Sequence, residues 1–172
     1  NYDGITSATP LALLKEGKLL EHISTWNLFL GIRGGCIGEV CIIALLAGAL
    51  YLLLRGYISW HIPISFITTT GLLTWVFGAK GFFTGDWLFH ILSGGLILGA
   101  FFMATDYVTS PLTRKGHLIF GISCGVLTAV IRLWGGYPEG VSYAILIMNA
   151  ATPLIDRYTK PRVYGTAVKS KG

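Results

Sequence analysis

The stretch HLIFGISCGVLTAVIRLW, residues 117–134, contains a single charged residue, Arg132. At a rise of about 1.5 Å per residue, a helix of this length covers about 27 Å, which is close to the hydrocarbon thickness of a bilayer. Four more apolar stretches occur along the chain, at residues 37–54, 62–77, 87–104 and 141–155. Because a backbone in lipid must satisfy its own hydrogen bonds, all five stretches are expected to be helices.

The composition also indicates a membrane protein. The chain has 53% hydrophobic residues and only 12% charged residues, which are too few charges to cover a soluble globule of this size. The predicted fold is an all-α membrane protein with a bundle of five transmembrane helices in residues 36–156. We expect an extracytoplasmic segment with a short helix in residues 1–35 and a basic cytoplasmic tail in residues 157–172.

Positive charges predict the orientation, because Lys and Arg gather on the cytoplasmic side. Five spans place the two termini on opposite sides of the membrane. The side of the tail carries eight such residues: Arg55, Arg114, Lys115, Arg157, Lys160, Arg162, Lys169 and Lys171. The other side carries five: Lys15, Lys18, Arg33, Lys80 and Arg132. The tail is therefore expected in the cytoplasm and the N-terminal segment outside, and the net charge of +5 gives no reason to expect nucleic-acid binding.

Glycine pairs four residues apart favour close packing between helices over a ligand role. There are three such pairs: Gly34 with Gly38, Gly95 with Gly99, and Gly121 with Gly125.

A polar lead-in, DGITSATPL at residues 3–11, precedes the apolar part of the chain. Thr9 and Pro10 are a good helix start, with threonine as the N-cap and proline at the first helical position, and this helix is expected to stop at Gly17. Proline also biases Thr9 toward an extended conformation that presents its side chain to solvent. A cap does not explain the residues that lead up to Thr9: Asp3, Thr6, Ser7 and Ala8.

These residues are similar to the Asp-x-x-(Ser/Thr)-(Gly/Ser)-Ala-Thr motif, in which a flavin transferase moves FMN from FAD onto the last threonine as a phosphoester. Four other stretches accompany the motif: GGCIGEVC (34–41), FFMATDYVTSPLT (101–113), GGYPEG (135–140) and MNAATPLIDR (148–157). Together they resemble the D subunits of Rnf electron-transport complexes and, more distantly, the B subunits of sodium-pumping NADH:quinone oxidoreductases. Family members are longer, with two repeated halves, so the resemblance implies that this chain is the C-terminal half and that an N-terminal half is missing.

The resemblance implies a subunit of an ion-translocating ferredoxin:NAD oxidoreductase in the bacterial plasma (inner) membrane, which works with other subunits and exports Na⁺ or H⁺. The subunit would carry FMN on Thr9, and the complex would also hold a noncovalent riboflavin at a site that no residue here identifies. FMN offers one- and two-electron chemistry that protein side chains lack. Its phosphate would lie at the start of the helix that begins at Pro10, where free N–H groups favour an anion.

Charged residues within apolar stretches are costly and usually functional. Glu39 and Asp106 are the candidates for an ion path, and a role in a structural network also explains Glu39. Asp86 and Asp106 bracket the stretch 87–104, where an ordinary interfacial position also explains them, and His90 lies one turn from Asp86. The three cysteines show no metal-ligand spacing, and no Ser/His/Asp arrangement occurs. We therefore expect neither a metal site nor a catalytic side chain in this chain.

Two other functions fit the same residues. A five-helix repeat of a membrane transporter would have internal glycines and a few buried acids but no redox cofactor, with Thr9 serving only as a cap. A structural assembly subunit would neither carry a flavin nor conduct a solute. A flavin that moves with this chain on a denaturing gel distinguishes the redox function from both alternatives.

Overall fold

The computed structural model describes residues 10–15, 25–31, 38–39, 41–78, 83, 85–137 and 139–160. Every regular element within these residues is helical, which confirms the all-α prediction for this part of the chain. In chain order, the elements are α1 (Pro10–Lys15), α2 (Thr25–Leu30), α3 (Ile42–Leu54), α4 (His61–Phe77), α5 (Trp87–Leu92), α6 (Leu96–Leu98), the π-helix η1 (Gly99–Met103), α7 (Arg114–Trp134) and α8 (Val141–Thr159).

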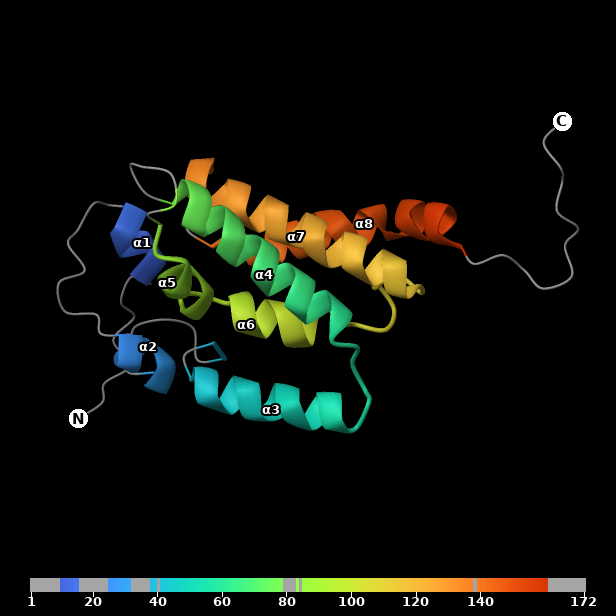
Figure 1. Cartoon of the computed structure of the whole chain (residues 1–172), viewed down its shortest axis with the longest axis horizontal. Helices are drawn as coiled ribbons and strands as arrows, with labels where there is room; N and C mark the ends of the chain where they lie inside the picture. Colours follow the sequence, from blue (N-terminus) through green and yellow to red (C-terminus); the bar gives the residue numbers. More distant parts are fainter. Residues whose placement is uncertain are drawn as a thin grey trace, which may run out of the picture.

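The long helices run along one axis of the molecule (Figure 1). Helix α7 packs against both α4 and α8, and α6 with η1 lies between this group and α3. The short helices α1, α2 and α5 gather at one end of the bundle, where α3 begins and α7 ends. The end of α3 and the starts of α4 and α7 lie at the opposite end. We call these the α1 end and the α3–α4 end.

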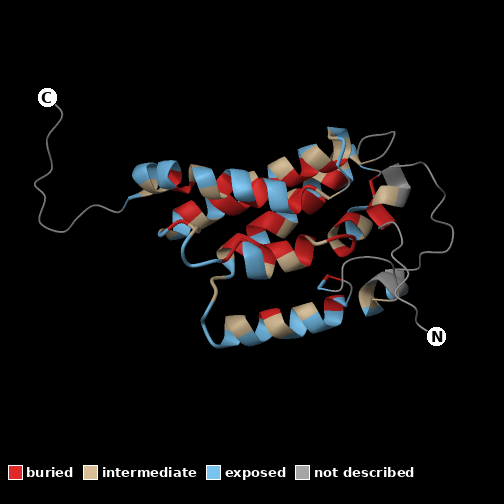
Figure 2. Ribbon diagram, turned by 180° about the vertical axis from the view of Figure 1, so that it is seen from behind, coloured by how far each residue is buried: buried red, intermediate tan, exposed pale blue. Residues whose placement is uncertain are grey.

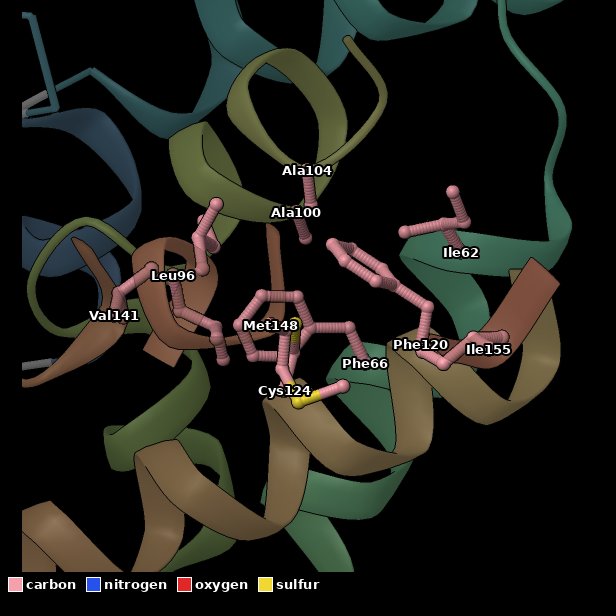
Figure 3. Close-up of a cluster of buried hydrophobic side chains, with 11 residues drawn as sticks. Ile62, Phe66, Leu96, Ala100, Ala104, Phe120, Cys124, Val141, Met148 and Ile155 are labelled. Carbon is pink, nitrogen blue, oxygen red and sulfur yellow. The ribbon is translucent and has the colours of Figure 1, made fainter. Parts of the chain in front are cut away.

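The main core lies between α4, α6, α7 and α8. Figure 3 shows Phe66 of α4, Phe120 of α7 and Met148 of α8 gathered there with Leu96 of α6, and all four side chains are buried. The outer surface of α3 and much of α8 is exposed in Figure 2, and it includes large apolar side chains such as Leu54 and Leu146. An extensive exposed apolar surface is typical of a protein that contacts a membrane.

Among the described helices, α7 is long and apolar enough to cross a bilayer, and α3 and α4 are shorter apolar helices. The prediction of one continuous helix over residues 87–104 is wrong, because α5 and α6 are separated at residues 93–95. Ser93 is extended and Gly94 has φ +67°, a left-handed conformation that glycine adopts without steric cost. All five apolar stretches thus contain helix, and their number of membrane crossings stays a prediction.

The second part of the broken segment ends in a π-helical turn. In η1, the N–H of Ala104 donates to the carbonyl of Gly99 at 2.7 Å, which is the i to i+5 bond of a π-helix. The residues that follow η1, Ala104 and Thr105, are buried.

Close packing of α7 on α4 depends on two of the predicted glycines. A Cβ atom added to Gly121 would lie 2.0 Å from Ser65 Oγ, and one added to Gly125 would lie 2.7 Å from Thr69 Cβ. The packing role is therefore confirmed for this pair. At Gly38, an added Cβ atom would have no neighbour within 4 Å among the described residues. Gly34 lies outside these residues, so the packing role of the Gly34 and Gly38 pair stays a prediction.

The Gly121→Ala variant should lower the melting temperature. Its methyl group would lie 2.8 Å from the carbonyl of Ile62 as well as against Ser65, and overpacking of this kind costs about 1–3 kcal/mol. Since 1 kcal/mol shifts Tm by roughly 2–4 °C in a chain of this size, we expect a decrease of about 2–12 °C in a detergent-solubilised thermal melt. Gly136→Ala is the matched control, because a Cβ atom there would have no neighbour within 4 Å in the described part of the chain. Equal melting temperatures for the two variants would contradict the packing role.

Candidate functional site

A group of ionisable side chains, three of them buried, surrounds the break between α5 and α6. Arg132 of α7 is 3% exposed, Glu39 is 6% exposed and His90 of α5 is 5% exposed. Glu139, which precedes α8, completes the group. We call these four residues, together with the backbone of residues 93–95, the break cluster. Its segments meet at the α1 end of the bundle (Figure 1).

The local sequence explains why the helix breaks here. Asp86 caps the start of α5, because its carboxylate accepts a hydrogen bond from the Phe89 N–H at 3.0 Å. The last bond of α5 runs from the Ser93 N–H to the Phe89 carbonyl at 2.8 Å, and the left-handed Gly94 then turns the chain. The final carbonyls of such a helix lose their intrahelical partners and need other donors.

Arg132 supplies those donors. Its Nη1 donates to the carbonyl of His90 and its Nη2 to the carbonyl of Ser93 at 3.4 Å, while its Nε donates to the carbonyl of Glu139 at 3.0 Å. The planar guanidinium has five N–H groups in a fixed fork, so one side chain can join these three carbonyls. The negative end of the α5 dipole also stabilises a cation at this position.

Two carboxylates face the glycines of the break. A Cβ atom added to Gly95 would lie 2.8 Å from Glu39 Oε2, and one added to Gly94 would lie 3.3 Å from Glu139 Oε1. The missing side chain of Gly95 therefore leaves room for the Glu39 carboxylate and not for the backbone of a neighbouring helix. The charges of Glu139 and Glu39 both act on Arg132. A buried arginine needs such compensation, since an uncompensated buried charge is strongly destabilising.

Helix α1 packs directly on the break. Leu11 is 2% exposed, and its Cδ1 would lie 3.0 Å from a Cβ atom added to Gly94. Helix α1 begins at Pro10, as the sequence predicts, and Thr9 is the residue joined to Pro10 in the chain. The predicted flavin residues themselves, Asp3, Thr6, Ser7, Ala8 and Thr9, lie outside the described residues.

The two ion-path candidates occupy different places. Glu39 is buried in the break cluster, whereas Asp106 is exposed beyond η1 and accepts a hydrogen bond from Thr109 Oγ1 at 3.1 Å. The structure therefore does not bring Asp106 to Glu39. Asp86 is also exposed, and its capping bond agrees with the interfacial interpretation.

Arg132 and Glu139 belong to this site but were not predicted as functional residues from the sequence. In the prediction of orientation, Arg132 is only one of the five positive charges opposite the tail. Its position inside an otherwise uncharged apolar stretch was the signal, because intramembrane arginines face a bundle interior and pair with acids or carbonyls. Glu139 lies in the turn GGYPEG, where a charged residue has no such signal.

Comparisons with known proteins agree on one family. A sequence model of the NQR2, RnfD, RnfE family matches residues 1–165. The D subunit of the proton-translocating ferredoxin:NAD(+) oxidoreductase complex of Clostridium ljungdahlii is 54% identical over 95% of this chain and 52% of its own length. The D subunit of the Na(+)-translocating ferredoxin:NAD(+) oxidoreductase complex of Acetobacterium woodii is 52% identical over 98% of this chain and 52% of its own length.

A third relative, the D subunit of the ion-translocating oxidoreductase complex of Stutzerimonas stutzeri, is 44% identical over 98% of this chain and 51% of its own length. The chain thus spans about half the length of the curated relatives it matches.

Proposed function

The chain belongs to the NQR2, RnfD, RnfE family, and we propose on this basis that it acts as part of the D subunit of an Rnf-type ferredoxin:NAD⁺ oxidoreductase. In this function the subunit carries FMN on Thr9 as a phosphoester and couples electron transfer to export of Na⁺ or H⁺. Its proposed partners are the other subunits of the complex, the N-terminal half that its relatives contain and a flavin transferase that loads the cofactor.

One observation carries this proposal. The helix that follows the flavinylation motif begins at Pro10 and buries Leu11 against Gly94 of the helix break. The chain position proposed for the redox cofactor is therefore tied to the break cluster, which holds the buried charges. FMN would supply one- and two-electron chemistry, and the residues of this chain would position it and carry the ion.

The break cluster has the features of an ion route. In membrane transporters, cations bind where a helix is interrupted and its backbone carbonyls are accessible. Here the interruption is flanked by the Glu39 and Glu139 carboxylates, and the buried Ser93 hydroxyl has no hydrogen-bond partner among the described residues. Asp106 remains the candidate at the far end of the segment. The relatives named above translocate different ions, so both Na⁺ and H⁺ remain in the proposal.

The fold also supports the proposed orientation in the plasma membrane. Basic residues mark the α3–α4 end of the bundle, at the end of α3, the start of α7 and the end of α8: Arg55, Arg114, Lys115, Arg157 and Lys160. Two acids, Asp106 and Asp156, accompany them. A positive excess at this end favours the cytoplasmic side, which leaves α1 and the break cluster toward the outside.

Intact mass of the purified chain tests the proposed cofactor. We expect the chain to gain the mass of one FMN phosphoester when it is produced together with a flavin transferase, and peptide mapping to find this mass on Thr9. The same chain should give a fluorescent band under ultraviolet light on a denaturing gel. Production without the transferase is the control and should give the unmodified mass. An unmodified mass in both preparations would refute the flavin and favour a transporter repeat or an assembly subunit.

A further inference from the structure

The guanidinium of Arg132 lies where a mobile cation would be expected to bind. The last carbonyls of an interrupted helix and the negative end of its dipole attract cations. In this chain, the carbonyls of His90 and Ser93 at the end of α5 accept hydrogen bonds from Arg132. The carboxylates that would balance a mobile cation, Glu39 and Glu139, instead act on the same guanidinium.

We propose that Arg132 is a tethered cation that fills the cation position of the helix break, and that a translocated cation passes only by displacing its guanidinium from the α5 carbonyls. The inference rests on the proposed function, because it assumes that this subunit translocates a cation. It adds a component to that function: a built-in competitor that keeps the route closed until a mobile cation takes its place.

The geometry allows such an exchange. The bond from Nη2 to the Ser93 carbonyl, at 3.4 Å, is longer than the usual 2.7–3.2 Å range for N–H···O bonds and is correspondingly weak. The Nε bond, at 3.0 Å, joins the guanidinium to the carbonyl of Glu139, which lies outside α5. A shift that retains the Nε bond would therefore free the His90 and Ser93 carbonyls, and the two carboxylates would remain to balance the incoming charge.

Cation dependence of the assembled complex tests the inference. Ferredoxin-dependent NAD⁺ reduction is measured in sealed vesicles against Na⁺ concentration at fixed pH, and against pH at fixed Na⁺. The variants are then compared in the titration, Na⁺ or pH, to which the activity of the unmodified complex responds. Arg132→Gln removes the competing charge, so we expect the half-saturating cation concentration to fall by about tenfold or more, within the usual range of coupling between ligands. Arg132→Lys keeps the charge and should remain close to the unmodified complex.

A second pair of variants keeps the test valid if Arg132→Gln does not assemble. Loss of Arg132 alone leaves the buried Glu39 carboxylate and the partly exposed Glu139 carboxylate without their cation, and an uncompensated buried charge is strongly destabilising. The double variant Arg132→Gln/Glu139→Gln removes one positive and one negative charge together. Compared with Glu139→Gln alone, it should also respond at a cation concentration about tenfold lower, because only the single variant retains the tethered cation.

The outcomes separate this inference from the proposed function. A complex without flavin on this chain, or without any cation dependence, would overturn the proposed function. A flavin-loaded, cation-dependent complex whose dependence is unchanged in Arg132→Gln and in the double variant would overturn the tethered cation alone. In that case Arg132 serves only to hold the broken helix together. A purely structural role would lower Tm without moving the half-saturating cation concentration.

Discussion

In the Thr9→Ala variant, ferredoxin-dependent NAD⁺ reduction by the complex is expected to fall to the level of a preparation that lacks this subunit. The hydroxyl of Thr9 is the proposed attachment point of FMN, and no side chain can replace the electron chemistry of a flavin. The fluorescent band of the chain should disappear from the denaturing gel together with the activity. Activity is measured on the assembled complex, with assembly checked by size-exclusion chromatography.

The matched control is Thr68→Ala, which removes a hydroxyl from an exposed threonine whose partners among the described residues are the carbonyls of Ile64 and Ser65 in the same helix, α4. This variant should retain both the fluorescent band and the activity. Thr9→Ser keeps a hydroxyl and should retain part of the flavin. Full activity of Thr9→Ala without a fluorescent band would show that electrons do not pass through a flavin on this residue.

Gly94→Ala is the substitution expected to disturb the structure of the site most. The residue has φ +67°, and a left-handed conformation costs an L-residue about 1–2 kcal/mol. The added methyl group would also lie 3.0 Å from Leu11 Cδ1 and 3.3 Å from Glu139 Oε1, and crowding of this kind costs about 1–3 kcal/mol more. We expect a large decrease in Tm and faster proteolysis near α1, because the methyl group pushes α1 away from the break.

Gly56→Ala separates the two costs. Gly56 has φ +70°, but a Cβ atom there would meet none of the described residues within 4 Å. This variant should show only the backbone cost, so the difference in Tm between the two variants measures the crowding against α1 and Glu139. The same decrease in both variants, with unchanged proteolysis near α1, would show that α1 does not depend on Gly94 for its position.

The parts of the fold that follow from local rules were predictable from the sequence. The start of α1 at Pro10 follows from the fixed φ of proline and its missing N–H group, and it was predicted correctly. The five apolar stretches all contain helix, because a chain in lipid has few other ways to satisfy its backbone. Gly121 was correctly assigned to packing, since a small residue is what lets two helices approach closely.

The break cluster was not predictable in the same way. Ser93 and Gly94 interrupt an apolar stretch without changing its polarity, so the hydropathy that identified residues 87–104 gave no sign of a break. Gly95 has the spacing of a packing glycine but admits a carboxylate. Arg132 and Glu39 are about 90 residues apart in the chain, and only the fold brings them to one place. The spacing of residues in the sequence shows which of them share one face of a helix. The partner of a buried charge depends instead on how all the helices are arranged.

The wide turn of η1 has a consequence for how this segment is compared between relatives. A π-helical turn holds about one residue more than an α-helical turn, so it acts like a one-residue insertion that leaves no gap in an alignment. Each residue of a regular helix advances the azimuth by about 100°, since a turn takes 3.6 residues. In a relative with a regular α-helical turn over residues 99–103, the side chains that correspond to Ala104 and Thr105 would therefore point to a different side of the helix. This would hold even where the aligned amino acids are identical.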